Sequence, residues 1–119
     1  MPTILVVEDD PSIRALLVMV LSENYTVLEA PGGQEGLRLF AQHHVDLIIT
    51  DLSMPQFDGF ELIRTVRATG RQVKIIAHSA LIAQAHVRSL ALTAGADLCL
   101  AKPVDLTTLE KTVADLLAA

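Results

Sequence analysis

The sequence predicts an α/β fold, in which a five-stranded parallel sheet carries helices on both faces. Short apolar runs rich in β-branched residues alternate along the chain with segments whose apolar residues recur every three or four positions. Such alternation indicates βαβ units and hence a parallel sheet. The run Leu47-Ile48-Ile49 is apolar throughout, as in a strand that is covered on both faces. Because crossovers are right-handed, few topologies remain, and we favour the strand order 2-1-3-4-5, one of the two common doubly wound orders.

The size and composition predict one domain that neither enters a membrane nor binds nucleic acid directly. The chain has 119 residues, enough for one covered sheet, and we expect residues 1–119 to form a single domain without an effector domain. No apolar run approaches the roughly 20 residues that span a bilayer. The segment from Met1 to Ile4 lacks the features of a secretory signal, so we expect a cytoplasmic protein. The net charge of -5 and the lack of a Lys/Arg cluster argue against contacts with nucleic-acid phosphates.

The first half of the chain is predicted to form two strands, each followed by a helix. Ile4–Val7 is the first strand, after which Asp10 suits a helix N-cap and Pro11 the first helical position. The apolar stripe of this helix consists of Ile13, Leu16, Leu17, Val20 and Leu21. A second strand, Thr26–Ala30, leads to a helix at about Gln34–His43. The residues that this helix is expected to bury are Leu37, Phe40 and Ala41.

The second half continues the alternation. After the strand that ends at Asp51, the spacing of Asp58 and Glu61 is that of a capping box and predicts a helix start. Gly70 is placed to end this helix with a left-handed cap. The remaining predicted elements are a strand Val73–Ala77, a helix from about 82 to 93, a strand Leu98–Ala101 and a last helix from Leu106 onward.

Three carboxylates are expected to share one edge of this sheet. Asp51 emerges at the carboxyl end of a central strand, where open α/β sheets bind ligands, although an Asp before a proline loop more simply opens a turn. Glu8 and Asp9 follow the neighbouring strand, about 4.8 Å away, and by themselves would simply place negative charge at a helix N-terminus. Two charges about 5 Å apart repel by roughly 3 kcal/mol at an effective dielectric near 20, so the cluster requires a cation or a raised pKa. Oxygen ligands alone favour Mg²⁺.

Two further side chains are expected at the same edge, beyond Asp51. Ser79 ends the fourth strand and Lys102 the fifth. Singly, Ser79 is more often a turn residue and Lys102 a solvated lysine. Together they are a hydrogen-bond donor and a positive charge, which a phosphoryl group on Asp51 would require. Carboxylates act as nucleophiles in such transfers and form an aspartyl-phosphate.

These residues together carry a family resemblance over essentially the whole chain. The motifs are Val6-Val7-Glu8-Asp9-Asp10, the segment from Asp51 to Pro55 with Asp58-Gly59, Ser79-Ala80 and Lys102-Pro103. In their order and spacing they resemble the receiver (CheY-like) domain of a two-component response regulator. The family has the flavodoxin-like doubly wound fold, and its strand order is the one favoured above.

The resemblance implies a function and a set of site residues. Asp51 would accept a phosphoryl group from a histidine kinase, a phosphotransfer protein or a small phosphodonor. Asp9, Asp51 and the backbone carbonyl of Ser53 would bind Mg²⁺, with Glu8 acting through water, and Ser79 and Lys102 would contact the phosphoryl group. The Lys102-Pro103 bond would be cis. The domain would catalyse only its own phosphorylation and dephosphorylation, and would signal to a downstream effector, with a phosphorylation-dependent homodimer as a further expectation.

The chain departs from the family pattern at three positions. Cys99 stands where most receivers carry a switch aromatic, and Val104 replaces the usual Phe after Lys102-Pro103. We therefore expect switching to depend on Ser79 and the loop at residues 80–82. His78, unusual for the family, is interpreted as a strand-end histidine with its hydrogen bonds satisfied.

Three other kinds of protein are alternatives to this interpretation. Aspartyl-phosphate phosphatases carry a second Asp where this chain has Ser53. A flavin module would need a hydroxyl- or glycine-rich phosphate loop in place of the acidic residues after the first strand. A phosphorylation-independent pseudo-receiver remains as the alternative function.

Overall fold

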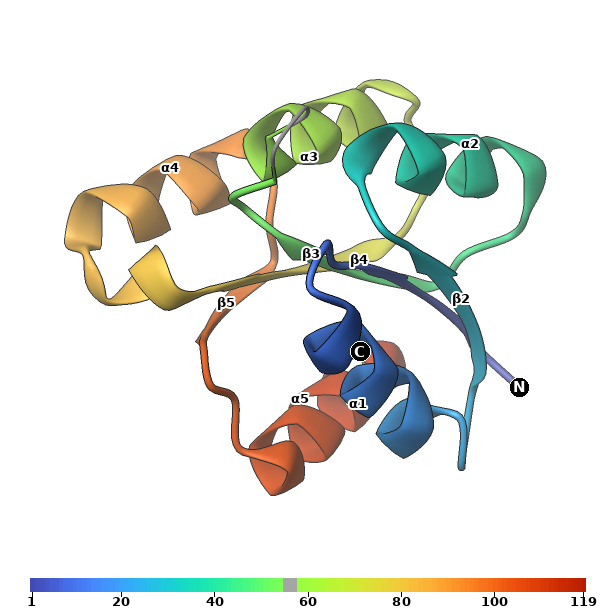
Figure 1. Cartoon of the computed structure of the whole chain (residues 1–119). Helices are drawn as coiled ribbons and strands as arrows, with labels where there is room; N and C mark the ends of the chain where they lie inside the picture. Colours follow the sequence, from blue (N-terminus) through green and yellow to red (C-terminus); the bar gives the residue numbers. More distant parts are fainter. Residues whose placement is uncertain (55–57) are drawn as a thin grey trace.

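The computed structural model describes residues 1–54 and 58–119, which form a parallel sheet and its flanking helices (Figure 1). The elements follow the alternation that the sequence predicts, with a short 3-10 helix, η1, added after the fourth strand. In chain order they are β1 Thr3–Val7, α1 Pro11–Leu21, β2 Thr26–Ala30, α2 Gly33–Gln42, β3 Leu47–Asp51, α3 Gly59–Ala68, β4 Lys74–Ser79, η1 Ala80–Ala83, α4 Ala85–Ala94, β5 Leu98–Ala101 and α5 Leu106–Ala118.

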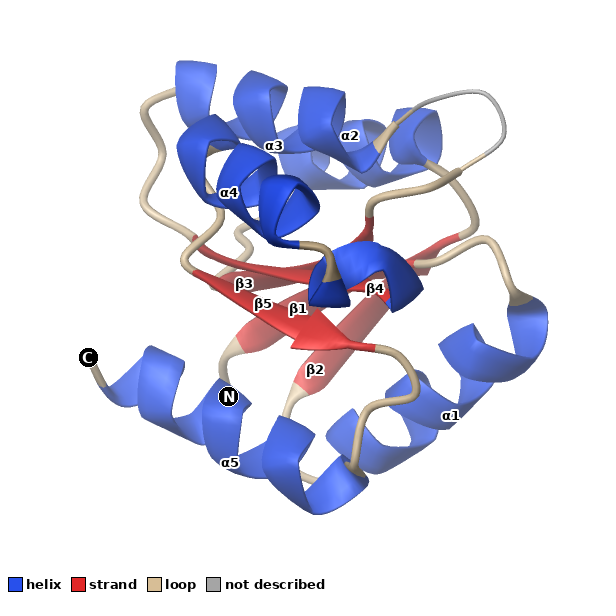
Figure 2. Ribbon diagram, turned by 90° about the vertical axis from the view of Figure 1, so that its left-hand side faces the viewer, coloured by secondary structure: helices blue, strands red, loops and turns tan. Residues whose placement is uncertain are grey.

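The strand order is β2-β1-β3-β4-β5 and all neighbouring strands are parallel, which confirms the predicted fold class and topology. Helices α1 and α5 cover one face of the sheet, and α2, α3 and α4 cover the other (Figures 1 and 2). β3 lies at the centre of the sheet, between β1 and β4. Its carboxyl end is therefore flanked on both sides by the ends of other strands.

Each face of the sheet has its own hydrophobic core. Alternate residues of a strand point to opposite faces, so Ile49 packs with α1 and α5 whereas Ile48 packs with the helices of the other face. The first core includes Leu17, Leu21, Leu109 and Val113 from α1 and α5. The second includes Phe40, Leu62, Ile63, Val66, Val87 and Ala91 from α2, α3 and α4. All five residues of β3 are buried, as its unbroken apolar run predicts.

Side-chain caps hold the helix starts at the edge where the strands end. The Asp10 carboxylate accepts hydrogen bonds from the amides of Ser12 and Ile13, with Pro11 at the first position of α1. Asp58 caps α3 by accepting from the amide of Glu61 at 2.7 Å. Both caps were predicted from the sequence, and they determine where the chain leaves the carboxylate loops.

Three local predictions were wrong. Leu16 is 42% exposed, because Leu17 and Leu21 form the buried line of α1 and Leu16 lies one residue off it. Ala41 is exposed for the same reason, since the buried face of α2 is centred on Phe40. The fourth helix begins at Ala85 rather than near residue 82, because η1 follows Ser79 and the extended backbone of Gln84 separates it from α4.

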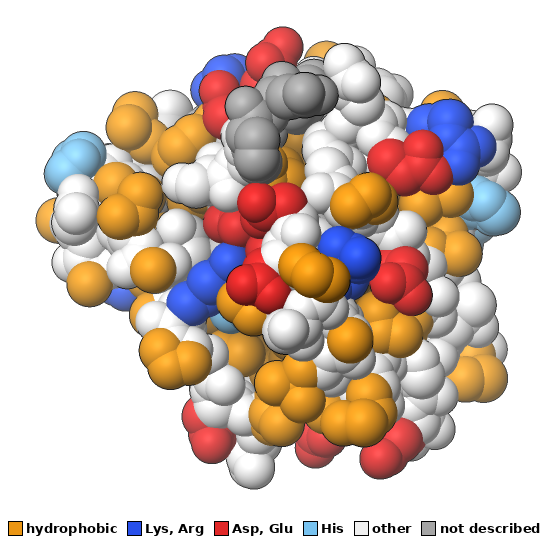
Figure 3. Space-filling view, viewed as in Figure 1, with side chains coloured by type: hydrophobic (Ala, Val, Ile, Leu, Met, Phe, Trp, Pro, Cys, Tyr) orange, Lys and Arg blue, Asp and Glu red, His pale blue; other side chains and the backbone are white. Residues whose placement is uncertain are grey.

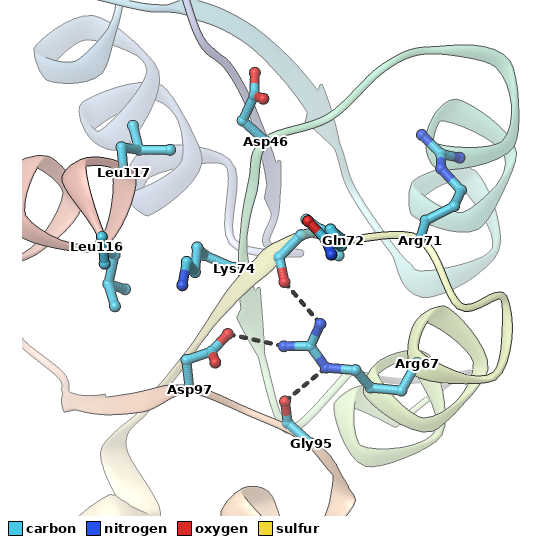
Figure 4. Close-up of a pocket in the computed structure, with 11 residues that line it drawn as sticks. Asp46, Arg67, Arg71, Gln72, Lys74, Gly95, Asp97, Leu116 and Leu117 are labelled. Carbon is cyan, nitrogen blue, oxygen red and sulfur yellow. Dashed lines mark hydrogen bonds and ion pairs between the residues drawn. The ribbon is translucent and has the colours of Figure 1, made fainter.

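Arg67 joins three elements at the opposite edge of the sheet. Its guanidinium group donates to the carbonyls of Val73 and Gly95 and to the Asp97 carboxylate, at 2.7, 2.9 and 2.8 Å (Figure 4). The groups lie beside a pocket of about 640 Å³ among the amino-terminal ends of the strands. None of the predicted site residues lines this pocket, so it is separate from the carboxylate edge.

Gly59 allows the backbone of α3 to approach the end of β3. A Cβ atom at residue 59 would lie 2.1 Å from the carbonyl oxygen of Asp51 and 2.7 Å from the Cα of Leu52. We expect Gly59→Ala to lower the free energy of unfolding by at least about 2 kcal/mol, because the backbone itself must move. Urea unfolding measures this change. Gly32→Ala is the control, since nothing lies within 4 Å of that position, and an equal loss there would contradict the explanation.

Candidate functional site

Three carboxylates converge at the carboxyl ends of β1 and β3. One oxygen each of Glu8, Asp9 and Asp51 lies within 4.8 Å of the others. The neighbouring register of Val7 with Thr50 brings the residues that follow, Glu8 and Asp51, side by side. Acidic side chains gather near the centre of this face, with basic side chains beside them (Figure 3). The structure thus brings together the carboxylates that the sequence predicts there.

Glu8 is buried and held by its backbone. Its amide donates to the carbonyl of Ala30, and its side chain accepts from the amide of Asp10 at 3.2 Å. Burial raises the pKa of Glu8, and the hydrogen bond with Lys102 opposes this rise. Arg14, which the sequence analysis did not single out, donates to the carbonyl of Glu8 at 2.8 Å. The contact could have been predicted from the position of Arg14 in the sequence, one helical turn after the Asp10 cap.

Asp51 is the last residue of β3 and is almost fully buried. Its two carboxylate oxygens have different partners. Oδ1 accepts a hydrogen bond from the amide of Ser53 at 3.1 Å, and Oδ2 accepts from the ammonium group of Lys102 at 2.9 Å. The carboxylate is therefore oriented by the chain that follows it and by a charge from a distant strand.

Lys102 supplies the positive charge of the site. Its Nζ lies 2.6 Å from Oε1 of Glu8 and 2.9 Å from Oδ2 of Asp51, with 15% of the side chain exposed. Burial lowers the pKa of this lysine. Its hydrogen bonds with Glu8 and Asp51 together raise the pKa by more than burial lowers it, so the pKa lies above its usual value. The Lys102-Pro103 peptide bond is cis, as the resemblance predicts.

Ser79 and Ser53 flank the carboxylate without joining the ion pairs. Ser79 is buried at the end of β4, and its hydroxyl oxygen accepts from the amide of Leu81 at 3.1 Å. Ser53 is exposed, and its amide contacts Asp51 as described above. Pro55, the last residue of the predicted Asp51 motif, lies outside the described residues.

His78 is directly beside Asp51, its partner in the register of β3 and β4. Only 3% of this residue is exposed, and its Nε2 has no hydrogen-bond partner among the residues that the structure describes. The prediction of a satisfied strand-end histidine is therefore wrong, because the strand places the ring in the interior rather than at the rim. Burial and the nearby charge of Lys102 lower the pKa of His78 to about 4, against a weaker opposing effect of Asp51.

The donor set fits a hard divalent cation. All three converging side chains offer oxygen, and two of them are buried. Oε1 of Glu8 has no hydrogen bond of good geometry within the described part of the chain, although Lys102 lies close to it. A cation would satisfy this oxygen and offset the repulsion among the carboxylates.

The buried neutral His78 predicts a specific loss of stability in acid. The unfolded chain takes up a proton on this residue near pH 6.5, whereas the folded chain does so only near pH 4. Stability should therefore fall as the pH falls through this window, by roughly 3 kcal/mol from this residue. Urea unfolding between pH 7 and 4 measures the change. His78→Gln should lose less stability than the native chain, whereas the exposed-residue control His86→Gln should not; equal losses in both variants would refute the assignment.

A model of the response regulator receiver domain matches residues 4–114 of the chain. The sensor protein EvgS of Escherichia coli K12 is 40% identical over 109 residues, which are 91% of this chain and 9% of EvgS. The transcriptional regulatory protein AfsQ1 of Streptomyces coelicolor is 38% identical over 105 residues, which are 87% of this chain and 46% of AfsQ1. The chain thus spans less than half the length of either of these relatives.

Solved structures agree with these matches. Chemotaxis protein CheY4 of Vibrio cholerae superposes with a TM-score of 0.92 at 29% identity, covering 98% of both chains. Response regulator protein TrrA of Thermotoga maritima, crystallised in complex with Mg²⁺ and BeF, gives a TM-score of 0.86 at 36% identity, covering 98% of this chain and 99% of TrrA. The match over residues 4–114, in the fold and strand order described above, shows that the chain belongs to the response regulator receiver domain family.

Proposed function

We propose that this domain is a phosphoacceptor switch, in which Asp51 takes a phosphoryl group in a Mg²⁺-dependent reaction and the change alters a partner-binding surface. One observation carries the proposal. Asp51 lies at the end of the central strand, accepts a hydrogen bond from the ammonium group of Lys102, and has Glu8 and Asp9 beside it. A nucleophile, a cation site and a positive charge are the parts that phosphoryl transfer requires.

Mg²⁺ is the proposed cofactor, and Glu8, Asp9, Asp51 and the carbonyl of Ser53 are the proposed ligands. Glu8 would act through a water molecule. Three oxygens within 4.8 Å support this assignment, as does the Mg²⁺ in the TrrA complex. When bound, the ion would neutralise charge on the transferring phosphoryl oxygens. The residues of the chain would hold it near Asp51.

The chain's own groups account for the transfer itself. A carboxylate oxygen of Asp51 attacks the phosphorus atom of the donor, and the bond from phosphorus to the donor imidazole nitrogen breaks, with its electron pair returning to the imidazole. Lys102 balances the added negative charge. The Ser79 hydroxyl turns from the amide of Leu81 to donate to the phosphoryl group, and this change moves the loop at residues 80–82.

The proposed phosphodonor is a histidine kinase or a phosphotransfer protein in the cytoplasm. EvgS is a sensor protein and the matched RcsC of Escherichia coli K12 is a sensor histidine kinase, whereas AfsQ1 is a transcriptional regulatory protein. A downstream effector, and a homodimer that forms on phosphorylation, are the proposed outputs. Residues 1–119 would act as one receiver unit that catalyses only its own phosphorylation and dephosphorylation. No helix within residues 1–54 and 58–119 is long and apolar enough to cross a membrane.

Intact mass spectrometry after incubation with acetyl phosphate tests the acceptor. We expect a gain of one phosphoryl group that requires Mg²⁺ and is absent from Asp51→Asn, because the amide is not a nucleophile for this transfer. Asp115→Asn, at an exposed carboxylate of α5, is the matched control and should gain the group normally. No gain under any condition, including incubation with a phosphorylated kinase, would refute the function and favour a phosphorylation-independent interaction module.

Removal of the Lys102 charge should separate metal binding from phosphorylation. Lys102→Met should slow phosphorylation by about tenfold or more, since a charged hydrogen bond is lost. The same change should strengthen Mg²⁺ binding severalfold, because the ammonium group no longer competes for Glu8 and Asp51.

Mass spectrometry measures the rate of phosphorylation, and isothermal titration calorimetry measures the affinity for Mg²⁺. Lys111→Met is the control, since that lysine is 75% exposed and, within residues 1–54 and 58–119, forms an ion pair only with Asp115, at 3.0 Å. Weaker Mg²⁺ binding in Lys102→Met would contradict the assigned role of the lysine.

A further inference from the structure

His78 belongs to a row of side chains that crosses the sheet at its charged edge. Ile49 and Ile76 both pack against α1 and α5, so Asp51 and His78, two residues later on each strand, face the same side. The two are direct partners between β3 and β4. On the other side of His78, its partner in β5 is Leu100, which also packs against this face. His78 therefore occupies the position between Asp51 and the strand that carries Lys102.

The Lys102 side chain must pass this position to reach Asp51. Lys102 follows β5, and Asp51 ends β3, two strands away. Neighbouring strands lie about 4.8 Å apart, so the lysine extends across the end of β4. Its ammonium group reaches both Asp51 and Glu8. His78 belongs to the strand that this route crosses, and the charge of Lys102 lowers its pKa.

The imidazole is a buried polar group without a partner in the described chain. Nε2 is inaccessible to solvent and makes no hydrogen bond with any described residue. A leucine of similar size would avoid the cost of such a group, which is about 1–3 kcal/mol. Burial and the adjacent lysine keep the ring uncharged at neutral pH. A neutral imidazole offers one nitrogen as a hydrogen-bond acceptor, and an ammonium group has three protons to donate.

We propose that His78 is a positioning residue for Lys102. It supports the side chain of the lysine, and its Nε2 accepts a hydrogen bond from the ammonium group when a cation engages Glu8 and Asp51. The inference rests on the proposed function, because Lys102 must hold its place while its two carboxylate partners turn to the metal and the phosphoryl group. His78 then retains the lysine at the edge of β4. No proton is transferred, and the imidazole remains neutral throughout.

A double-mutant cycle tests whether His78 acts through Lys102. We expect His78→Leu to slow phosphorylation by acetyl phosphate about threefold to tenfold, and to have little effect in the Lys102→Met background. His78→Gln, which keeps a polar atom at similar reach, should restore most of the rate. The thermal midpoint of His78→Leu should be unchanged or higher, because the unpartnered nitrogen is removed. A purely structural role would instead lower stability and slow the reaction equally in both backgrounds, and that result would overturn the proposal.

Nitrogen-15 NMR of the histidine ring tests the contact without phosphorylation. His43, His44 and His86 are exposed, and His78→Gln identifies the remaining signal. We expect the proton of His78 on Nδ1, and an Nε2 shift that moves on saturation with Mg²⁺ in the native chain but not in Lys102→Met. A proton on Nε2, or an Nε2 shift indifferent to Mg²⁺, would overturn the proposal. If the native chain gains no phosphoryl group while the Nε2 response appears, the phosphoacceptor function fails and this contact stands.

Discussion

The repulsion among Glu8, Asp9 and Asp51 is the constraint around which this edge of the molecule is built. One oxygen of each lies within 4.8 Å of the others, and two of the three residues are buried. Lys102, which follows β5 two strands away from β3, supplies a counter-charge. The lysine can reach them only because β4 and β5 lie beside β3 in this order. The repulsion among these carboxylates is greatest when neither a cation nor another positive partner is bound. Binding of such a partner therefore changes the energy of this site, and this change is the physical basis of a switch.

The carboxyl ends and the amino-terminal ends of the strands differ in what they contribute to the protein. Every buried polar or charged residue in the described chain lies at or next to the carboxyl end of a strand: Glu8, Thr50, Asp51, His78 and Ser79. Burying such groups costs stability unless they are partnered. At the amino-terminal ends of the strands, Arg67 links separate segments of the chain, because it contacts two backbone carbonyls and a carboxylate from them. The stability that the site costs is thus offset by two apolar cores and by contacts at a distance from it.

His78 connects the energetics of the site to its proposed chemistry. It is the strand partner of Asp51 and precedes Ser79, yet its Nε2 makes no hydrogen bond with any part of the chain that the structure describes. A buried polar atom without a hydrogen bond is accounted for if it gains a hydrogen-bond partner while the protein functions. Lys102, which must change partners when a cation binds, is the neighbour able to provide one. The same lysine would then contact groups on two neighbouring strands, Asp51 at the end of β3 and His78 on β4.

The sequence by itself determined the features that depend on local patterns. Alternating apolar runs predicted the strands, Asp10 and Asp58 predicted helix caps, and the order of acidic and basic residues predicted the site edge. Tertiary structure decided what depends on the neighbours of a residue. The exposure of Leu16 follows from which line of α1 meets the sheet, and the break before α4 follows from the turn after Ser79. The unpartnered state of the His78 ring likewise arises only when three strands meet, because no periodicity in one segment encodes contacts made by another.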